Sequence, residues 1–126
     1  MATKKTSKIL MVEDDIFLRK LYRDKLKREG FEFIEAINGV EGVNKIQNEK
    51  PDLIILDLML PIKNGFDVLT EIKQDPKLKK IPVIILTNLG QEDDIKEGLA
   101  LGANEYLVKT EIRLTEAVEK IKKLLS

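Results

Sequence analysis

The 126-residue sequence contains no cysteine and no histidine. Without cysteine, disulfide bonds, thiolate metal sites and cysteine nucleophiles are excluded. Without histidine, the chain lacks the usual general base, the usual charge switch near neutral pH and the commonest ligand of transition metals. A metal site or a reaction in this protein would therefore depend on oxygen and amine side chains.

The sequence also lacks an excess of charge and any long apolar run. It has 22 basic and 22 acidic residues, so there is no basic excess of the kind that binds nucleic acid or an anionic membrane surface. No apolar run approaches the ~20 residues that a membrane span needs. The basic start MATKKTSK is followed by only ILMV before acidic residues begin, which is not a signal peptide. We expect a short flexible tail over residues 1–6 and a cytoplasmic protein.

What is present is the composition of an ordinary globular domain, with 43% hydrophobic and 35% charged residues. A chain of this length can bury about two-thirds of its unfolded surface. We expect one domain over residues 1–126, without an internal linker or repeat. Because Ser126 directly follows the last expected helix, we expect no output domain in this chain. A stand-alone protein and a fragment of a longer one both remain open.

Short apolar runs alternate with amphipathic segments. The expected strands are residues 8–12, 31–37, 53–56, 81–87 and 105–108. Apolar residues three or four apart mark the expected helices: Leu18, Leu21, Tyr22 and Leu26; Val40, Val43 and Ile46; Phe66, Leu69 and Ile72; Ile95 and Leu99; Val118, Ile121 and Leu125. Continuous apolar strands alternating with such helices indicate an α/β fold. We expect a three-layer, doubly wound fold with a five-stranded parallel sheet and five helices.

Capping and turn residues lie between these segments. Asp15 is a good N-cap for the first helix, and Gly30 a good C-terminal cap. Asn38-Gly39 and Lys63-Asn64-Gly65 are typical of turns. The stretch QEDD at 91–94, with three acids, favours the start of the fourth helix through its dipole.

Charged and hydroxyl side chains follow four of the five expected strands. They are Glu13, Asp14 and Asp15 after the first, Asp57 after the third, Thr87 at the end of the fourth and Lys109 after the fifth. Nothing comparable follows the second strand. Ligands of open parallel sheets bind outside the carboxyl ends of the strands. We therefore expect these side chains to meet at one edge.

Three carboxylates at one edge, Glu13, Asp14 and Asp57, would repel one another and raise their own pKa values unless cations offset the charge. Oxygen ligands without histidine or cysteine favour Mg²⁺, Mn²⁺ or Ca²⁺ over zinc. A carboxylate such as Asp57, beside such an ion and Lys109, could attack phosphorus to form an acyl phosphate. Thr87 and Lys109 could then bind the phosphoryl oxygens.

These residues make the chain resemble the receiver domains of two-component response regulators, the family that includes the chemotaxis response regulators. The motifs MVEDD, LDLMLPIKNG, ILTN and YLVKT carry the resemblance, which covers roughly residues 7–125. It implies the flavodoxin-like strand order 2-1-3-4-5 and Asp57 as the phosphoacceptor. It also implies a Mg²⁺ site formed by Asp14, Asp57 and the carbonyl of Met59, with Glu13 acting through a metal-bound water.

The resemblance further implies a signalling module that takes a phosphoryl group from a histidine kinase or a phosphotransfer protein. Asp57, Lys109 and Thr87 would carry out this transfer, and the only catalysis would be the module's own phosphorylation and dephosphorylation. Thr87 and Tyr106 would switch a surface formed by the fourth helix, the fifth strand and the last helix. That surface would bind a downstream protein, which the sequence does not name, and could hold a weak dimer of an otherwise monomeric protein. No nucleic acid or membrane partner is expected.

One residue departs from the usual pattern of the family, and two others stand at positions that bear on how long the phosphate lasts. The family usually has proline after the lysine, often with a cis peptide bond, whereas this chain has Thr110. A cis bond before a non-proline residue costs about 3–4 kcal/mol, so the loop either stores strain or takes another path. Met59 and Leu89, two residues after Asp57 and Thr87, flank the route of the hydrolytic water in the family. Because both are apolar, we hypothesise slow self-dephosphorylation.

Other functions fit the sequence less well. An aspartyl-phosphate phosphatase that acts on outside substrates commonly has a second Asp where this chain has Met59. A flavin-binding protein would need a hydroxyl- or glycine-rich phosphate loop after the first strand. An interaction module without phosphorylation would not need the complete set of acids, threonine and lysine. Tyr106 is either a core aromatic or a switch residue.

Overall fold

The computed structural model describes residues 6–126, so the tail expected over residues 1–6 lies outside the described residues except for Thr6. The strands are β1 (Lys8–Val12), β2 (Glu32–Ala36), β3 (Leu53–Leu56), β4 (Val83–Thr87) and β5 (Glu105–Val108). The helices are α1 (Ile16–Arg28), α2 (Gly39–Glu49), α3 (Gly65–Gln74), α4 (Glu92–Ala100) and α5 (Leu114–Leu125). Neighbouring strands are parallel in the order β2-β1-β3-β4-β5. The predicted α/β fold and strand order are confirmed.

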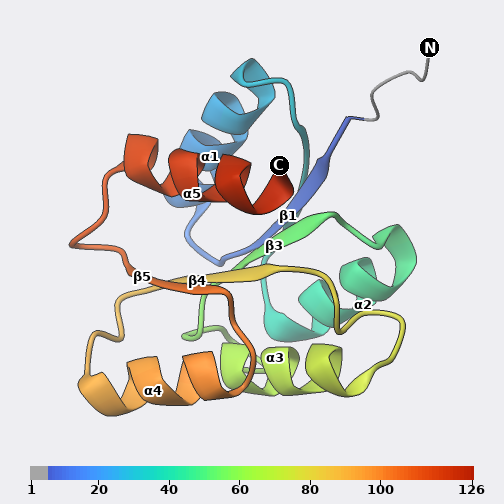
Figure 1. Cartoon of the computed structure of the whole chain (residues 1–126), viewed down its shortest axis with the longest axis vertical. Coiled ribbons are helices and arrows are strands. Elements are labelled where there is room, and N and C mark those ends of the chain that lie inside the picture. Colours follow the sequence, from blue (N-terminus) through green and yellow to red (C-terminus); the bar gives the residue numbers. More distant parts are fainter. Residues whose placement is uncertain (1–5) are drawn as a thin grey trace.

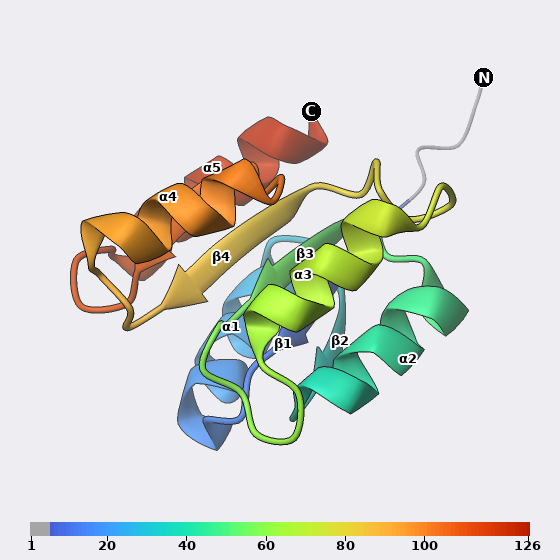
Figure 2. The same ribbon diagram turned by 90° about the horizontal axis from the view of Figure 1, so that it is seen from below.

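Helices cover both faces of the sheet. Helices α1 and α5 lie on one face, and α2, α3 and α4 lie on the other (Figure 1), as the view from below also shows (Figure 2). Among residues 6–126, none of the helices has both the length and the apolar character that crossing a membrane requires.

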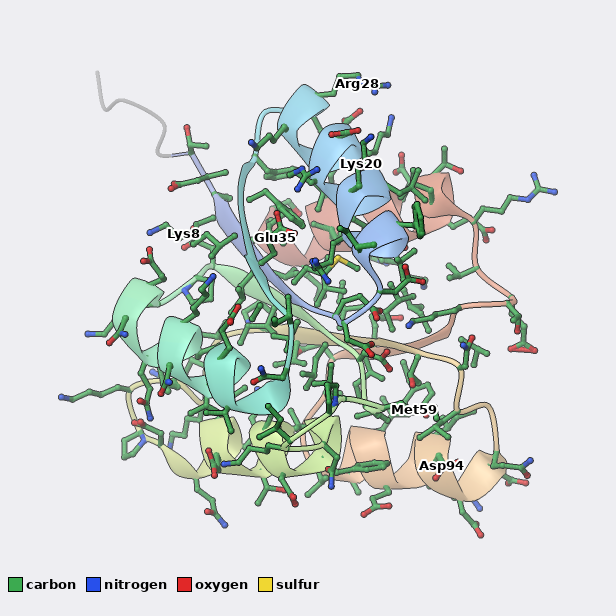
Figure 3. All side chains as sticks on the ribbon, turned by 180° about the vertical axis from the view of Figure 1, so that it is seen from behind. Lys8, Lys20, Arg28, Glu35, Met59 and Asp94 are labelled. Carbon is green, nitrogen blue, oxygen red and sulfur yellow. The ribbon has the colours of Figure 1, made fainter. Side chains whose placement is uncertain are left out.

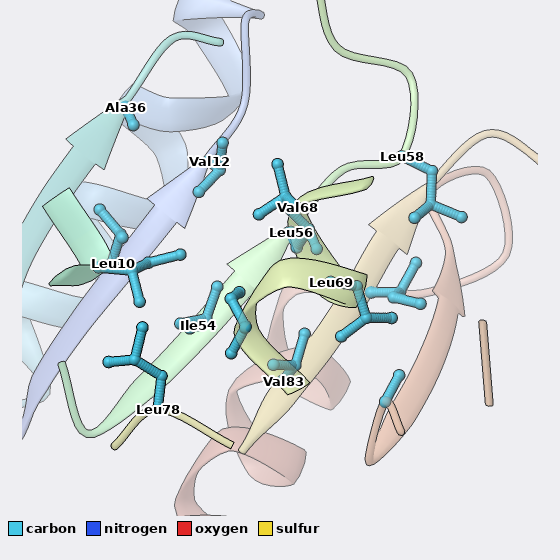
Figure 4. Packing of buried hydrophobic residues seen from close by; sticks show 14 residues of the cluster. Leu10, Val12, Ala36, Ile54, Leu56, Leu58, Val68, Leu69, Leu78 and Val83 are labelled. Carbon is cyan, nitrogen blue, oxygen red and sulfur yellow. The ribbon is translucent and has the colours of Figure 1, made fainter. Parts of the chain in front are cut away.

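Each strand supplies apolar side chains to both faces in turn. In β1, Ile9 and Met11 pack in the cluster that includes α1 and α5 side chains, whereas Leu10 and Val12 pack in the cluster on the opposite face. Figure 4 shows this second cluster, in which strand side chains meet those of α3. Because both of their faces are buried, the three inner strands β1, β3 and β4 are nearly continuous apolar runs rather than alternating ones.

The same alternation places the residues that follow the strands. Ile55 of β3 belongs to the cluster with α1 and α5, so Asp57, two residues on, falls on that side of the sheet. Met11 of β1 belongs to the same cluster, and Glu13 follows it by the same step of two. The two carboxylates therefore leave neighbouring strands toward the same side.

Three residues of the predicted helix stripes are exposed instead of buried: Leu21, Val40 and Leu99. The buried residues of α2 are Gly39, Gly42 and Ile46. Val40 does not lie on this side of the helix, so its side chain is exposed. In α4, Gly98 is the only buried residue, because the helix packs its glycine against the sheet and turns Leu99 outward.

The helix ends largely follow the sequence. Asp15 caps α1 by accepting hydrogen bonds from two backbone N–H groups, and Gly30 follows the helix with a φ of 94°. The chain bends at Ile37 and Asn38, and Asn38 is also the N-cap of α2, because its side chain accepts from the N–H of Glu41. Asn64 caps α3 in the same way.

The loop from β3 to α3 is held tightly against the end of β3. The N–H of Gly65 donates to the carbonyl of Leu58 over 2.9 Å. A Cβ on Gly65 would lie 2.2 Å from the carbonyl oxygen of Asp57 and 2.6 Å from the Cα of Leu58. Ile62, within the loop, has a φ of 71°, which is a strained conformation for a β-branched residue. Only glycine at position 65 lets the loop pass this close.

We expect Gly65→Ala to lower the free energy of unfolding by about 2–4 kcal/mol, because the new methyl group meets backbone atoms that cannot move alone. Gly90→Ala is the matched control, since a Cβ there would lie 3.5 Å from the Val108 side chain, an ordinary contact. Urea denaturation of both variants measures the difference. Equal stability of the two variants would contradict the close approach.

Candidate functional site

One lysine and two buried carboxylates meet at the carboxyl ends of β1, β3 and β5. The Nζ of Lys109 lies 2.8 Å from Oδ2 of Asp57 and 2.6 Å from Oε1 of Glu13. Glu13 is 1% exposed and Asp57 is 3% exposed. Two carboxylates this far from water need a cation, and Lys109 provides one positive charge for the pair.

One ammonium leaves the two carboxylates with a net negative charge. The pKa of Glu13 is raised from 4.5 to about 7, chiefly by burial and to a smaller extent by the charge of Asp57, against the lowering effects of Lys109 and the N–H of Asp15. Burial alone would lower the pKa of Lys109, but its hydrogen bond to Asp57 and its close contact with Glu13 raise it above the ordinary value. Lys109 therefore stays charged, and the site can accept further positive charge.

Backbone groups orient both carboxylates. The N–H of Met59 donates to Oδ1 of Asp57 over 3.1 Å, while Oδ2 takes the lysine. The N–H of Asp15 donates to Oε2 of Glu13 over 3.0 Å. Since each of these loops belongs to a strand end, the geometry of the sheet fixes the directions of the two side chains.

Asp14 adds a third carboxylate to this group. One carboxylate oxygen each from Glu13, Asp14 and Asp57 lie within 4.8 Å of one another, and Asp14 is exposed at the mouth of the site. Oε1 of Glu13 is buried without a hydrogen bond of good geometry, although Lys109 is near. Oxygen-only ligands at such spacing fit a hard divalent cation. Glu13 and Asp57 each lie against Lys109 and accept from a backbone N–H, whereas the Asp14 carboxylate is exposed to solvent.

Thr87 and Tyr106 meet at a residue that the sequence did not connect to them. The hydroxyl of Thr87, which is fully buried, accepts a weak hydrogen bond from the N–H of Leu89 over 3.4 Å. The phenol of Tyr106 donates to the carbonyl of Leu89 over 2.6 Å. Within residues 6–126 the hydroxyl of Thr87 has no hydrogen bond to Asp57. The peptide groups of Leu89 thus join the two predicted switch residues.

Tyr106 also packs against α4. A Cβ on Gly98 would lie 3.0 Å from the Tyr106 ring and 2.7 Å from the Ile85 side chain, so the glycine in α4 makes room for the ring. Burial raises the pKa of Tyr106 to about 12, with smaller contributions from Asp94 and Asp57. The phenol therefore stays a hydrogen-bond donor. A single glycine inside a helical pattern is the sequence signal of this close packing.

No acid, threonine or lysine directly follows β2, but a residue within this strand connects to the loop after β1 through Arg19. Glu35 of β2 accepts a hydrogen bond from Nε of Arg19 over 2.9 Å, and Nη1 of Arg19 donates to the carbonyl of Glu13 over 2.9 Å. Sequence reasoning missed Arg19 and Glu35. The only signal was a pair of arginines, Arg19 and Arg23, spaced one turn apart on the first helix.

The loop after Lys109 contains no cis peptide bond and so none of the strain that such a bond would bring. No cis peptide bond occurs among residues 6–126, so the Lys109–Thr110 bond is trans. The N–H groups of Glu111 and Ile112 both donate to the carbonyl of Val108, which turns the chain toward α5. The N–H of Lys109 donates to the carbonyl of Thr87 over 2.8 Å, so the lysine backbone is anchored to β4.

A family model described as "Response regulator receiver domain" matches residues 9–122. The phosphate regulon transcriptional regulatory protein PhoB of Rhizobium meliloti (strain 1021) is 38% identical over 118 residues, which are 94% of this chain and 52% of PhoB. The structure of a putative response regulator from Chloroflexus aurantiacus J-10-fl superposes with a TM-score of 0.89 at 30% identity, covering 96% of this chain and 98% of that one. The Mn²⁺-bound form of the response regulator Rcp1 is 37% identical, with a TM-score of 0.78 and coverage of 94% and 89%. The chain spans only 39% to 52% of the length of the curated relatives it matches.

The raised pKa of Glu13 gives a pH dependence with a defined sign. Between 4.5 and about 7 the folded protein holds a proton on Glu13 that the unfolded chain has lost. Raising the pH from about 5 to about 8 therefore lowers the stability of the metal-free protein through this group. Relative to Glu13→Gln, which cannot ionise, the wild type should lose stability over this range. Urea denaturation in EDTA at both pH values measures the free energy of unfolding of each protein. A gain in stability by the wild type relative to Glu13→Gln would contradict the raised pKa.

Proposed function

Because the chain belongs to the family of two-component response regulator receiver domains, we propose that it accepts a phosphoryl group on Asp57 from a histidine kinase or a phosphotransfer protein. The observation that carries the proposal is the position of Asp57. Its carboxylate is buried at a strand end, Lys109 donates to one of its oxygens, and two further acids lie beside it. A structural carboxylate would need no such neighbours.

In the proposed transfer, a carboxylate oxygen of Asp57 forms a bond to phosphorus while the bond from phosphorus to the donor's histidine nitrogen breaks. The leaving nitrogen keeps the electron pair. Lys109, which now donates to Asp57, turns its ammonium to a phosphoryl oxygen, and the N–H of Met59 holds the carboxylate in place. Positioning and charge neutralisation are most of what phosphoryl transfer requires. A divalent cation bound by Asp14 and Asp57 would offset the charge shared by the carboxylates and the phosphoryl oxygens.

We propose Mg²⁺ as the resident cation, with Mn²⁺ and Ca²⁺ as substitutes. Asp14 and Asp57 would bind it directly, the carbonyl of Met59 would be a third ligand, and Glu13 would act through a water. The carboxylate spacing supports a hard cation, and the Mn²⁺-bound form of Rcp1 is a related protein with a divalent ion.

Exposed apolar side chains around the acids support a protein as the phosphoryl donor. Large hydrophobic residues that are exposed in the loops and first helical turns at this edge are Ile16, Phe17, Ile37, Val40, Met59 and Ile62. Phe17 is 82% exposed, two residues after Asp15. Apolar groups gathered beside a charged site are typical of a protein interface.

The connection from Thr87 through Leu89 to Tyr106 supports a switch. A phosphoryl group on Asp57 would offer oxygens to the Thr87 hydroxyl, which now accepts only a weak bond from Leu89. Drawing Thr87 inward would move the Leu89 peptides and release Tyr106, whose ring packs on α4 at Gly98. The surface of α4, β5 and α5 would then differ between the two states, which is what a downstream protein needs to tell them apart.

Incubation with acetyl phosphate and Mg²⁺ tests the acceptor. The intact mass should rise by about 80 Da, and Asp57→Asn should abolish the gain because the amide cannot form an acyl phosphate. Asp24→Asn, an exposed acid on α1, is the control and should gain the same mass. A gain that survives Asp57→Asn would contradict the assignment.

The lifetime of the phosphate tests the role of Met59, which is 57% exposed beside the acceptor. Its thioether cannot orient water, so we expect a long-lived phosphoprotein. Met59→Asn should speed the loss of phosphate by about tenfold or more, since an amide can hold the attacking water. Met59→Leu keeps an apolar side chain of similar size and should leave the rate unchanged. The rate at which the phosphorylated mass disappears is measured for both variants. Equal rates would show that the side chain at position 59 does not control the lifetime of the phosphate.

A further inference from the structure

Arg19 connects the acid-bearing loop after β1 to strand β2. Its Nη1 donates to the carbonyl oxygen of Glu13 over 2.9 Å, and its Nε donates to Oε1 of Glu35 over 2.9 Å. The side chain of Arg19 is only 11% exposed, so its planar guanidinium is held mainly by these partners. Figure 3 shows Glu35 on β2 beside the helix that carries Lys20, which is α1.

Glu35 is itself held in place from two sides. Arg23, one turn further along α1, donates from Nη1 to Oε2 of Glu35 over 2.8 Å. Burial acts to raise the pKa of Glu35, but the hydrogen bonds and charges of Arg23 and Arg19 bring it below the ordinary value. The carboxylate therefore remains ionised near neutral pH, and its contact with Arg19 is an ion pair.

The contacts of Arg19 fix the peptide group that carries Asp14. The N–H of Glu13 donates to the carbonyl of Ala36 in β2 over 2.9 Å, and the carbonyl of Glu13 accepts from Arg19. That carbonyl lies in the same planar group as the N–H and the Cα of Asp14, so its direction fixes the backbone from which the Asp14 side chain extends. Asp14 is exposed, and its carboxylate makes no hydrogen bond or ion pair within the described part of the chain. The backbone alone positions it.

We propose that Arg19, held by Glu35, is a positioning residue that preorganises Asp14 for a divalent cation. The proposal rests on the metal-dependent function given above, but it concerns residues that touch neither the ion nor the phosphoryl group. Removing outer partners of metal ligands weakens metal binding by about 10- to 100-fold in other proteins. Electrostatics alone predicts tighter Mg²⁺ binding, because removing the positive charge of Arg19 removes its repulsion of the bound ion. The sign of the change therefore separates positioning from simple electrostatics.

Calorimetric titration with Mg²⁺ tests the proposal on wild type, Arg19→Gln, Glu35→Gln and Arg23→Gln. Arg23→Gln is the matched control, because it removes the same charge from the same helix and a bond to Glu35, but no bond to Glu13. We expect Arg19→Gln to weaken Mg²⁺ binding by about tenfold. Glu35→Gln should weaken it less, in the same direction, and Arg23→Gln should stay within about twofold of wild type. Thermal unfolding in EDTA checks that each variant is folded.

Unchanged or tighter binding by Arg19→Gln overturns the proposal, and so does equal weakening by Arg23→Gln. Should Arg19→Gln fail to fold, Arg19→Lys decides: it keeps the charge but cannot bridge two acceptors in the same way, so weakened binding supports positioning and unchanged binding overturns it. The titration needs no phosphorylation. A wild type that binds Mg²⁺ but gains no phosphate contradicts the proposed function alone, whereas a wild type that binds no Mg²⁺ overturns the role of Arg19 as well.

Discussion

The candidate site depends on one ammonium, that of Lys109, lying between two buried carboxylates. Removing one partner of a buried ion pair typically costs about 3–5 kcal/mol, because the remaining charge is stranded. Here two acids share the single lysine, and strand β4 separates β3 from β5. A long side chain is therefore needed to reach across the end of β4, and the backbone bond from Lys109 to Thr87 fixes where it starts.

Tyr106 lies on the opposite face of the sheet from Glu13 and Asp57. Glu13 and Asp57 leave their strands toward α1 and α5, by the alternation that buries Met11 and Ile55 on that side. Tyr106 packs against the cluster on the other face, beside α4. The peptide groups of Leu89 lie between Thr87 and Tyr106. In the proposed switch, phosphorylation at Asp57 would change the surface around Tyr106 and α4 through these peptide groups.

Much of the fold and of the candidate site was predictable from the sequence, because it depends on local patterns. Continuous apolar runs predict buried parallel strands, and the order of acids, threonine and lysine along the chain predicts which strand ends they follow. The rest depends on packing. Leu99 is exposed because Gly98 is the residue of α4 that meets the sheet, and either could have done so. The contact of Arg19 with Glu35 depends on how α1 lies on the sheet, and the role of Leu89 belongs to its backbone, which carries no sequence signal.

Reductive trapping of the acyl phosphate tests most directly whether Asp57 is the carboxylate that carries the phosphoryl group. Borohydride reduces an acyl phosphate to an alcohol with release of phosphate, so a phosphorylated aspartate becomes homoserine and can be located by peptide sequencing. We expect homoserine at position 57 and aspartate at position 14 after phosphorylation and reduction. Homoserine at position 14, or at any position other than 57, would contradict this assignment.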